Sequence, residues 1–271
     1  MRRMDKPKII YKYESFSAQS LRNLKAQSVY FGSPLAFNDP YDCALKAGVA
    51  NPSDSAVEKL RAAYAVSADV PADIQKLFAQ SSTDDLREIL MCRATQILDE
   101  HTEGFLRERG VTCFSERNND LLMWSHYGGR YKGFCLGFST DYEPFSKIRK
   151  VEYSEEMPKI DVVEVLMHDN FDKMLDRFYT KSQSWAYESE WRCLHKKAGT
   201  LFKYEAGALE SVFFGPDIDL ESLEIVCLVL AGQNPNVRFW RGKRSNERFE
   251  VAFKEFTYTS YLEAKKKGIT T

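Results

Sequence analysis

The chain has 271 residues, of which 44% are hydrophobic and 28% charged, and its formal net charge is −1. This length suits a globular protein that buries a sizeable core without disulfides or a structural metal. A net charge this close to zero supplies no basic field, so a nucleic-acid partner is not indicated. No run approaches the roughly 20 apolar residues that a membrane helix needs, and no secretory signal pattern follows the first residues.

The six cysteines occur singly, without a CxxC pair or a Cys/His set at zinc-ligand spacing. The four histidines are well separated and no HExxH motif is present, so a metal site built on histidines is not expected. Free thiols in apolar surroundings behave as small hydrophobes. We therefore expect reduced cysteines in the core and a cytoplasmic location.

The first elements in chain order are short. β-branched and aromatic residues predict a strand at 9–13, helix spacing follows over 17–25, and a second strand is expected at 29–31. Residues 53–108 then change to apolar positions three and four apart, with N-cap patterns before each half. This spacing predicts a helical insertion, for which packing or a lid are the two roles considered.

The later part of the chain is predicted to contain mainly strands, at 111–114, 133–138, 148–153, 190–195, 209–214, 237–242 and 249–256. The last two are expected to form a hairpin. A helix is expected over 162–182, and residues 220–230 fit either a helix or a buried strand. The prediction is one α+β domain over residues 1–271, with a mixed, mostly antiparallel sheet, a helical insertion at about 53–108 and flanking helices.

Three separated segments, 37–42, 124–127 and 185–192, combine polar and aromatic residues that could form a site. The first, Phe37-Asn38-Asp39-Pro40-Tyr41-Asp42, is a turn by its chemistry, because Asn and Asp bond the local backbone and Pro fixes φ. It is either a structural Asx-turn or a turn that directs Asn38 or Asp39 into a cleft.

The second segment, Trp124-Ser125-His126-Tyr127, carries rings with hydrogen-bonding tips. Such rings suit a planar ligand, for example a nucleobase or nicotinamide. His126 is a candidate general base, and Trp124 and Tyr127 are candidate ligand contacts. The alternative is a helix end that buries the two large rings.

The third segment, Trp185-Ala186-Tyr187-Glu188-Ser189-Glu190-Trp191-Arg192, contains two carboxylates two residues apart. In an extended strand Glu188 and Glu190 would share one face, with Arg192 as the compensating cation and Trp191 on the other face. The alternative is an ion-pair network on an exposed sheet face. Lys12, between two tyrosines in the first strand, is either an anion-binding lysine or a surface residue. No GxGxxG or GxxxxGK[ST] loop is present.

The chain resembles the bacterial family known as domain of unknown function 2971 (DUF2971). The resemblance rests on segments that occur in the family's order: Tyr11-Lys12-Tyr13, Val29–Pro34 with Phe37–Pro40, Val111–Ser115, Trp124–Tyr127, Gly133–Phe138 and Trp185–Arg192. This family name implies no established activity.

More weakly, Lys12, Tyr30 and Glu188-Ser189-Glu190 resemble the ordered pattern of ADP-ribosyltransferases, although Lys12 stands where those enzymes use His or Arg. The resemblance implies NAD as a substrate, with no permanently bound cofactor and no metal. Glu190 would hold the nicotinamide ribose and Glu188 would orient or deprotonate the acceptor. Lys12 would bind the diphosphate, and Tyr30 or Trp124 would stack on nicotinamide.

These observations leave three hypotheses. The first is an NAD-using ADP-ribosyltransferase-like enzyme or NAD glycohydrolase that acts as a toxin or anti-phage effector. The second is a module that binds a nucleotide or a protein partner without catalysis. The third is a metal-dependent nuclease that uses Asp39, Asp42, Glu188 and Glu190 around a divalent cation.

Overall fold

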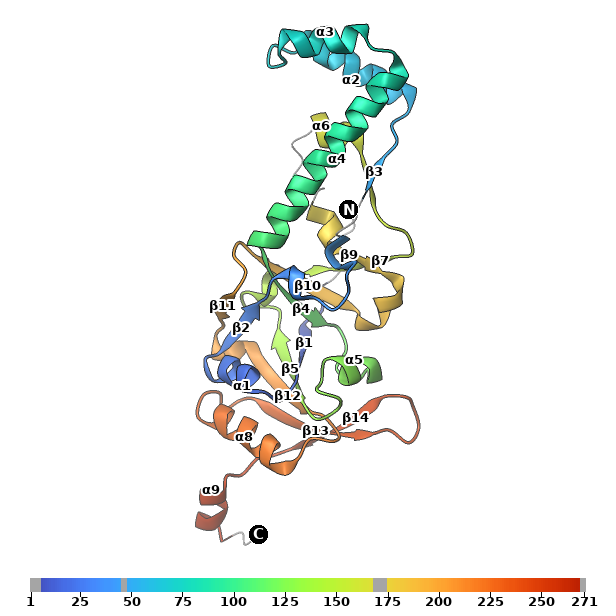
Figure 1. The fold of residues 1–271 in the computed structure, drawn as a ribbon. Coiled ribbons are helices and arrows are strands. Elements are labelled where there is room, and N and C mark those ends of the chain that lie inside the picture. The colour runs from blue at the N-terminus through green and yellow to red at the C-terminus, as the bar shows by residue number, and fades with distance from the viewer. Residues whose placement is uncertain (1–5, 45–47, 168–174, 269–271) are drawn as a thin grey trace. The chain divides into compact units, whose positions relative to one another are not determined.

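The computed structural model describes residues 6–44, 48–167 and 175–268. The described chain divides into two compact units, drawn in Figure 1. Unit 1 comprises residues 1–32, 110–151 and 184–271, and unit 2 comprises residues 33–109 and 152–183. No helix within the described ranges is long and apolar enough to cross a membrane.

Unit 1 is built on an eight-stranded sheet in the order β14-β13-β12-β5-β1-β4-β10-β6, in which only the β12–β13 pair is parallel. Unit 1 also contains a separate two-stranded antiparallel sheet, β2–β11. The strands are β1 (Ile9–Glu14), β2 (Ser28–Phe31), β4 (Gly110–Ser115), β5 (Phe134–Ser139), β6 (Arg149–Lys150), β10 (Glu190–His195), β11 (Thr200–Lys203), β12 (Leu209–Phe214), β13 (Arg238–Arg244) and β14 (Val251–Phe256). The helices are α1 (Ala18–Lys25), α5 (Leu121–His126), α8 (Leu220–Ala231) and α9 (Tyr261–Lys266), with short 3-10 turns at η3 (Phe145–Lys147), η5 (Gln183–Glu188) and η6 (Ala206–Ala208).

The two faces of this sheet carry different cores, because successive side chains of a strand point to opposite faces. In β1, Ile10 joins the larger cluster, which also contains buried residues of α1 and α8. Tyr13 instead joins a smaller cluster with Met123 and Trp124 of α5. The fold is therefore α+β with a mixed, mostly antiparallel sheet, as the sequence predicts.

Unit 2 contains the predicted helical insertion. Its helices are α2 (Asp54–Val66), α3 (Ala72–Gln80), α4 (Thr83–Glu108) and α6 (Val162–Met167), with 3-10 turns at η1 (Pro34–Ala36), η2 (Asp42–Ala44) and η4 (Arg177–Tyr179). Its strands form two parallel pairs, β3 (Gly48–Ala50) with β8 (Lys159–Asp161) and β7 (Glu152–Ser154) with β9 (Thr180–Ser182). The side chains of Ser53 and Ser82 cap α2 and α4, as their positions in the sequence predict.

Several expected elements differ from the observed ones. The strand expected at 148–153 is divided into β6 and β7, because the chain leaves unit 1 after Val151. Of the helix expected over 162–182, the described residues form α6, the 3-10 turn η4 and β9, while residues 168–174 lie outside the described ranges. Strand pairing with β7 overrides the helical spacing there. Residues 220–230 are helical, and the β13–β14 hairpin is confirmed, but Phe249 precedes β14 and is 97% exposed.

Candidate functional site

Two of the three segments chosen from the sequence come together in unit 1. Trp124–Tyr127 occupies the end of α5 and the residue after it, while 185–192 runs from η5 into β10. The remaining segment, 37–42, belongs to unit 2 and is described with it.

Helix α5 begins where Asp120 accepts hydrogen bonds from the backbone nitrogens of Leu122 and Met123, at 2.9 and 3.1 Å. Trp124 is fully buried at 0% exposure, and its Nε1 donates to the carbonyl oxygen of Asn118 at 2.8 Å. Its indole therefore anchors the helix in the core and has no exposed face for a ligand. The structure thus assigns Trp124 to packing, not to stacking on nicotinamide.

The chain turns sharply after α5. A Cβ atom at Gly128 would lie 2.5 Å from the Trp124 ring, closer than real Cβ contacts, so only glycine fits there. This turn leaves His126 exposed and Tyr127 half-buried at the end of the helix. The packing of Trp124 therefore constrains the residue that follows these two polar rings.

The expected extended Glu-x-Glu strand is interrupted. Glu188 ends the 3-10 turn η5, Ser189 adopts a left-handed φ of 45°, and β10 starts only at Glu190. The turn is held by the Ser115 hydroxyl, which donates to the Glu188 carbonyl at 2.6 Å. The expectation that strand alternation places both carboxylates on one face is therefore wrong for Glu188.

Two hydrogen bonds join the end of α5 to η5. The Tyr127 hydroxyl donates to Oε1 of Glu188 at 2.6 Å, and Nδ1 of His126 is hydrogen-bonded to the Tyr187 hydroxyl at 2.9 Å. Glu188 is 3% exposed, so the first of these bonds satisfies a buried carboxylate oxygen.

The rings of His126, Trp185 and Tyr187 form a contiguous group, here called the His126 aromatic group. Their centroids lie 5.9 to 6.4 Å apart in tilted or edge-on arrangements. His126 is exposed, and the other two rings are half-buried. This group therefore combines accessible π surface with a titratable nitrogen, one residue away from the Tyr127–Glu188 hydrogen bond.

Glu190 and Arg192 form a buried ion pair on one face of β10. Nε and Nη2 of Arg192 donate to the two carboxylate oxygens of Glu190 at 2.7 and 3.0 Å, and the side chains are 0% and 3% exposed. Trp191 packs into the core on the opposite face, as the alternation predicts. Because both oxygens of Glu190 bind the guanidinium, the negative charge of Glu190 is largely neutralised within the fold.

Lys12 does not lie with these groups. Strand register aligns Tyr11 with Ser115 and Ser115 with Glu190, so these three residues share one sheet face. Lys12 points to the other face, where its Nζ contacts the Cys113 carbonyl at 3.4 Å and lies 5.5 Å from the Phe114 ring centroid. The position of Lys12 gives no support to the expected diphosphate contact.

Tyr30 is also separate from the carboxylates. It lies on β2, in the two-stranded sheet with β11, and is 43% exposed opposite Leu201. The three positions that resemble an ADP-ribosyltransferase, Lys12, Tyr30 and Glu190, therefore do not share one sheet face.

In unit 2, the turn at 37–42 contains an Asx-turn at Asp39. Oδ1 of Asp39 accepts from the backbone nitrogen of Tyr41 at 2.9 Å, and Asn38 is exposed. Asp42 forms a buried ion pair with Lys181 at 3.2 Å. The carboxylate of Asp42 thus fastens this turn to β9.

One further acid, Glu116, was not among the site residues predicted from the sequence. Glu116 follows β4 and accepts hydrogen bonds from Lys150 at 2.8 Å and from the indole of Trp191 at 2.7 Å. Burial raises the pKa of Glu116, but these two donors outweigh it and hold the pKa below its usual value. The only signal in the sequence was an acid directly after a buried strand. Among the described residues, no group of three or more His, Cys, Asp or Glu is placed to hold a metal ion.

Unit 1 is thus an α+β fold, and the hydrogen-bonded polar groups of its candidate site lie on α5, η5 and β10. Residues 123–193 match the model of a family described as "Protein of unknown function (DUF2971)". The resemblance to this family is confirmed over that stretch, which contains both segments whose side chains meet. No curated protein and no solved structure matches the chain significantly.

Proposed function

We propose that unit 1 recognises a nucleotide through the His126 aromatic group. The observation that carries this proposal is the presence of three contacting rings, each with a hydrogen-bonding tip, of which one is exposed and two are half-buried. Such rings bind planar heterocycles by stacking and orient them by hydrogen bonds. Nδ1 of His126 is occupied by Tyr187, so Nε2 is the nitrogen available to a ligand.

A second candidate, an NAD glycohydrolase or ADP-ribosyltransferase-like transferase, is favoured by the Tyr127–Glu188 hydrogen bond beside this group. In this reaction the bond between ribose C1′ and the nicotinamide nitrogen breaks, and nicotinamide leaves with the bonding electron pair. A water or acceptor oxygen forms the new bond to C1′ and loses its proton to His126. Glu188 stabilises the positive charge that develops on the ribose.

This scheme departs from the roles that the ADP-ribosyltransferase resemblance implies: charge stabilisation moves from Glu190 to Glu188, and removal of the acceptor proton moves from Glu188 to His126. Glu190 holds Arg192 with both oxygens, so we assign charge stabilisation to Glu188. The substrate must reach a carboxylate that is 3% exposed, so Tyr127 has to move or exchange its hydrogen bond during binding. A role as toxin or anti-phage effector stays a prediction.

The other hypotheses have less support. A nuclease built on Asp39, Asp42, Glu188 and Glu190 would need carboxylates to bind a divalent cation. Asp42 is paired with Lys181, and Glu190 is paired with Arg192. No observation on the described residues favours a particular protein partner.

Calorimetric titration of the full chain with NAD tests recognition. We expect saturable binding that His126→Ala and Trp185→Ala each weaken by about tenfold, a typical loss when one stacking ring is removed. Tyr261→Ala is the matched control, since it removes an exposed ring on α9. Absence of saturable binding, or equal loss in the control, would exclude the proposal.

Release of nicotinamide, followed by chromatography, separates the two candidates. If the chain is an enzyme, Glu188→Gln should abolish release while NAD binding persists. Saturable binding with no release by the unmodified chain would leave only the binding module.

A further inference from the structure

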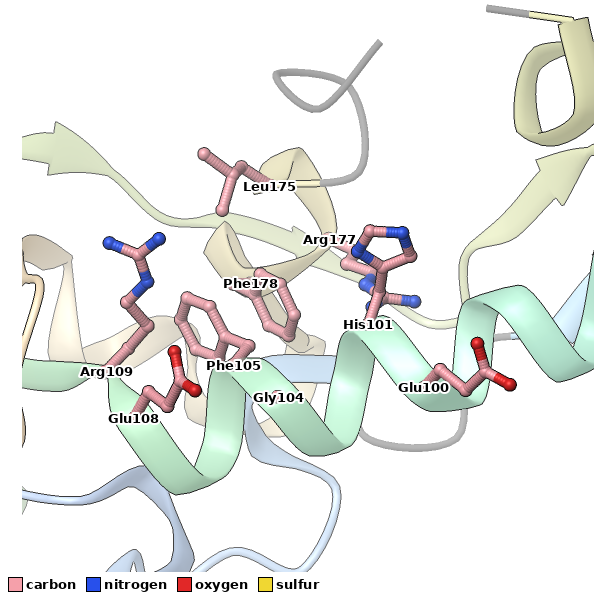
Figure 2. A pocket seen from close by; sticks show the side chains of 9 residues that line it. All are labelled: Glu100, His101, Gly104, Phe105, Glu108, Arg109, Leu175, Arg177 and Phe178. Atoms are coloured by element: carbon pink, nitrogen blue, oxygen red, sulfur yellow. The ribbon is translucent and has the colours of Figure 1, made fainter. Parts of the chain in front are cut away.

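Unit 2 contains a pocket that lies outside the proposed nucleotide site. Its volume is about 300 Å³, at the lower end of the range for small-molecule sites. Figure 2 shows that α4 supplies one side of it and the residues around η4 the other. The lining residues are Glu100, His101, Gly104, Phe105, Glu108, Arg109, Leu175, Arg177 and Phe178.

Arg177 is the unusual member of this lining. Its side chain is 3% exposed, yet its Nε and Nη1 have no hydrogen-bond partner within the described part of the chain. In the described ranges only Nη2 has an acceptor, the Leu98 carbonyl at 3.4 Å, and the Thr102 hydroxyl already donates to that oxygen at 2.7 Å. Burial lowers the pKa of Arg177 to about 10, with the Asp99 charge opposing this effect.

The charges around the pocket do not supply the missing acceptor. Glu100 and Glu108 line it, but neither forms an ion pair with Arg177 among the described residues. Arg109 and His101 add basic groups to the same lining. Since buried charges in proteins are normally paired, the free edge of the guanidinium calls for an anion that the described residues do not supply.

The remaining wall is flat and apolar. The rings of Phe105 and Phe178 stack with centroids 3.5 Å apart and planes at 6°, and the Arg177 guanidinium lies 4.7 Å from the Phe178 centroid. Gly104 leaves space beside them, because a Cβ atom there would meet nothing within 4 Å. A glycine inside a long helix costs stability, so an open pocket is a physical reason to keep it there.

We propose that this pocket binds a small organic anion, whose carboxylate or phosphate group is held by Arg177 and whose apolar part lies against Phe105 and Phe178. A planar guanidinium with free N–H groups matches the oxygen geometry of both anions. This inference is independent of the proposed nucleotide site, which lies in unit 1 and shares no residue with the pocket.

Titration of the full chain with benzoate, phenyl phosphate and inorganic phosphate tests it, by calorimetry and by the shift in Tm at constant ionic strength. We expect saturable binding of benzoate or phenyl phosphate with a rise in Tm, and the tighter of the two identifies the anion. Inorganic phosphate should bind at least about tenfold more weakly, because it lacks the apolar part. Equal binding of inorganic phosphate would overturn the role of the aromatic wall.

Two variants locate the site. Arg177→Met should abolish binding by removing the charge, and Gly104→Leu should abolish it by filling the pocket while improving helix propensity. Arg107→Met is the control, since it removes an exposed arginine of α4 that is not part of the lining. Failure of the unmodified chain to bind any of the three probes would overturn the proposal. Undiminished binding by Gly104→Leu would do so even if Arg177→Met did not fold.

Discussion

The hydroxyl of Tyr127 lies 2.6 Å from Oε1 of Glu188, 61 residues further along the chain. This bond joins the residue after α5 to the last residue of η5, and a parallel bond joins their neighbours His126 and Tyr187. Bonds to a charged, buried acceptor are stronger than bonds between neutral groups. The pair therefore fixes the geometry on which the proposed nucleotide site depends.

Replacing Tyr127 with Phe should destabilise the chain by about 1–3 kcal/mol, because a buried carboxylate oxygen loses a hydrogen-bond donor. Urea unfolding measures this loss, with Tyr261→Phe on the exposed side of α9 as a control expected to change little. In a double-mutant cycle with Glu188→Gln, we expect the two losses to be coupled. Fully additive losses would show that the hydroxyl does not act through this carboxylate.

Replacing Arg192 with Met should cost about 3–5 kcal/mol, since it leaves the buried carboxylate of Glu190 without its bidentate partner. The double variant Glu190→Gln, Arg192→Met should recover part of this loss. For comparison, Arg107→Met breaks an exposed pair with Glu103 and should cost less than about 1 kcal/mol. Similar losses in the buried and exposed pairs, again by urea unfolding, would contradict this account.

The carboxyl of Glu14 should make stability depend on pH. Burial raises the pKa of Glu14, and the nearby Lys12 charge offsets part of that rise. Because the pKa is higher in the folded state, folding favours the protonated form, and this contribution is lost as pH rises through the folded-state pKa. Glu14→Gln should therefore stabilise the chain more at about pH 8 than at about pH 4, where the unfolded carboxyl is also largely protonated. Urea unfolding at both pH values checks the sign, and a larger gain at the lower pH would refute it.

The cysteines should differ sharply in reactivity. Cys92 on α4 is exposed, while Cys113 is half-buried and the other four are buried. Burial raises the pKa of Cys193 to about 11 and that of Cys227 to about 12, which suppresses the reactive thiolate. A thiol reagent should therefore modify one site rapidly in the native chain, as counted by mass spectrometry, and Cys92→Ser should remove that site.

Local patterns were sufficient for much of the fold. The serine caps of α2 and α4, the β13–β14 hairpin and the opposite faces of Trp191 and Arg192 all follow from rules that act within a few residues. Alternation also shows that Lys12 points away from its flanking tyrosines. Alternation does not show whether Glu190 shares the sheet face of Lys12 or that of the tyrosines, because this depends on how β1 and β10 each pair with β4.

The candidate site was harder to predict, because backbone conformation and long-range pairing decide it. The left-handed Ser189 breaks the expected Glu-x-Glu strand, and serine gives no strong signal for that conformation. Residues 180–182 form β9 because β7 pairs with them, although helical spacing covers the same residues. The lack of acceptors for Nε and Nη1 of Arg177 within the described residues could not be predicted either, since it depends on which acceptors α4 brings within reach.

Strand β1 is the first strand in the sequence, yet it lies between β4 and β5 in the sheet. Its pairing partners run over 110–115 and 134–139, so a growing polypeptide carries β1 unpaired while the ribosome adds the helices of residues 53–108. Contacts between residues so distant in sequence also form slowly. During synthesis, the helices can therefore form well before the sheet, and an exposed β1 is the segment that a chaperone would have to shield until then.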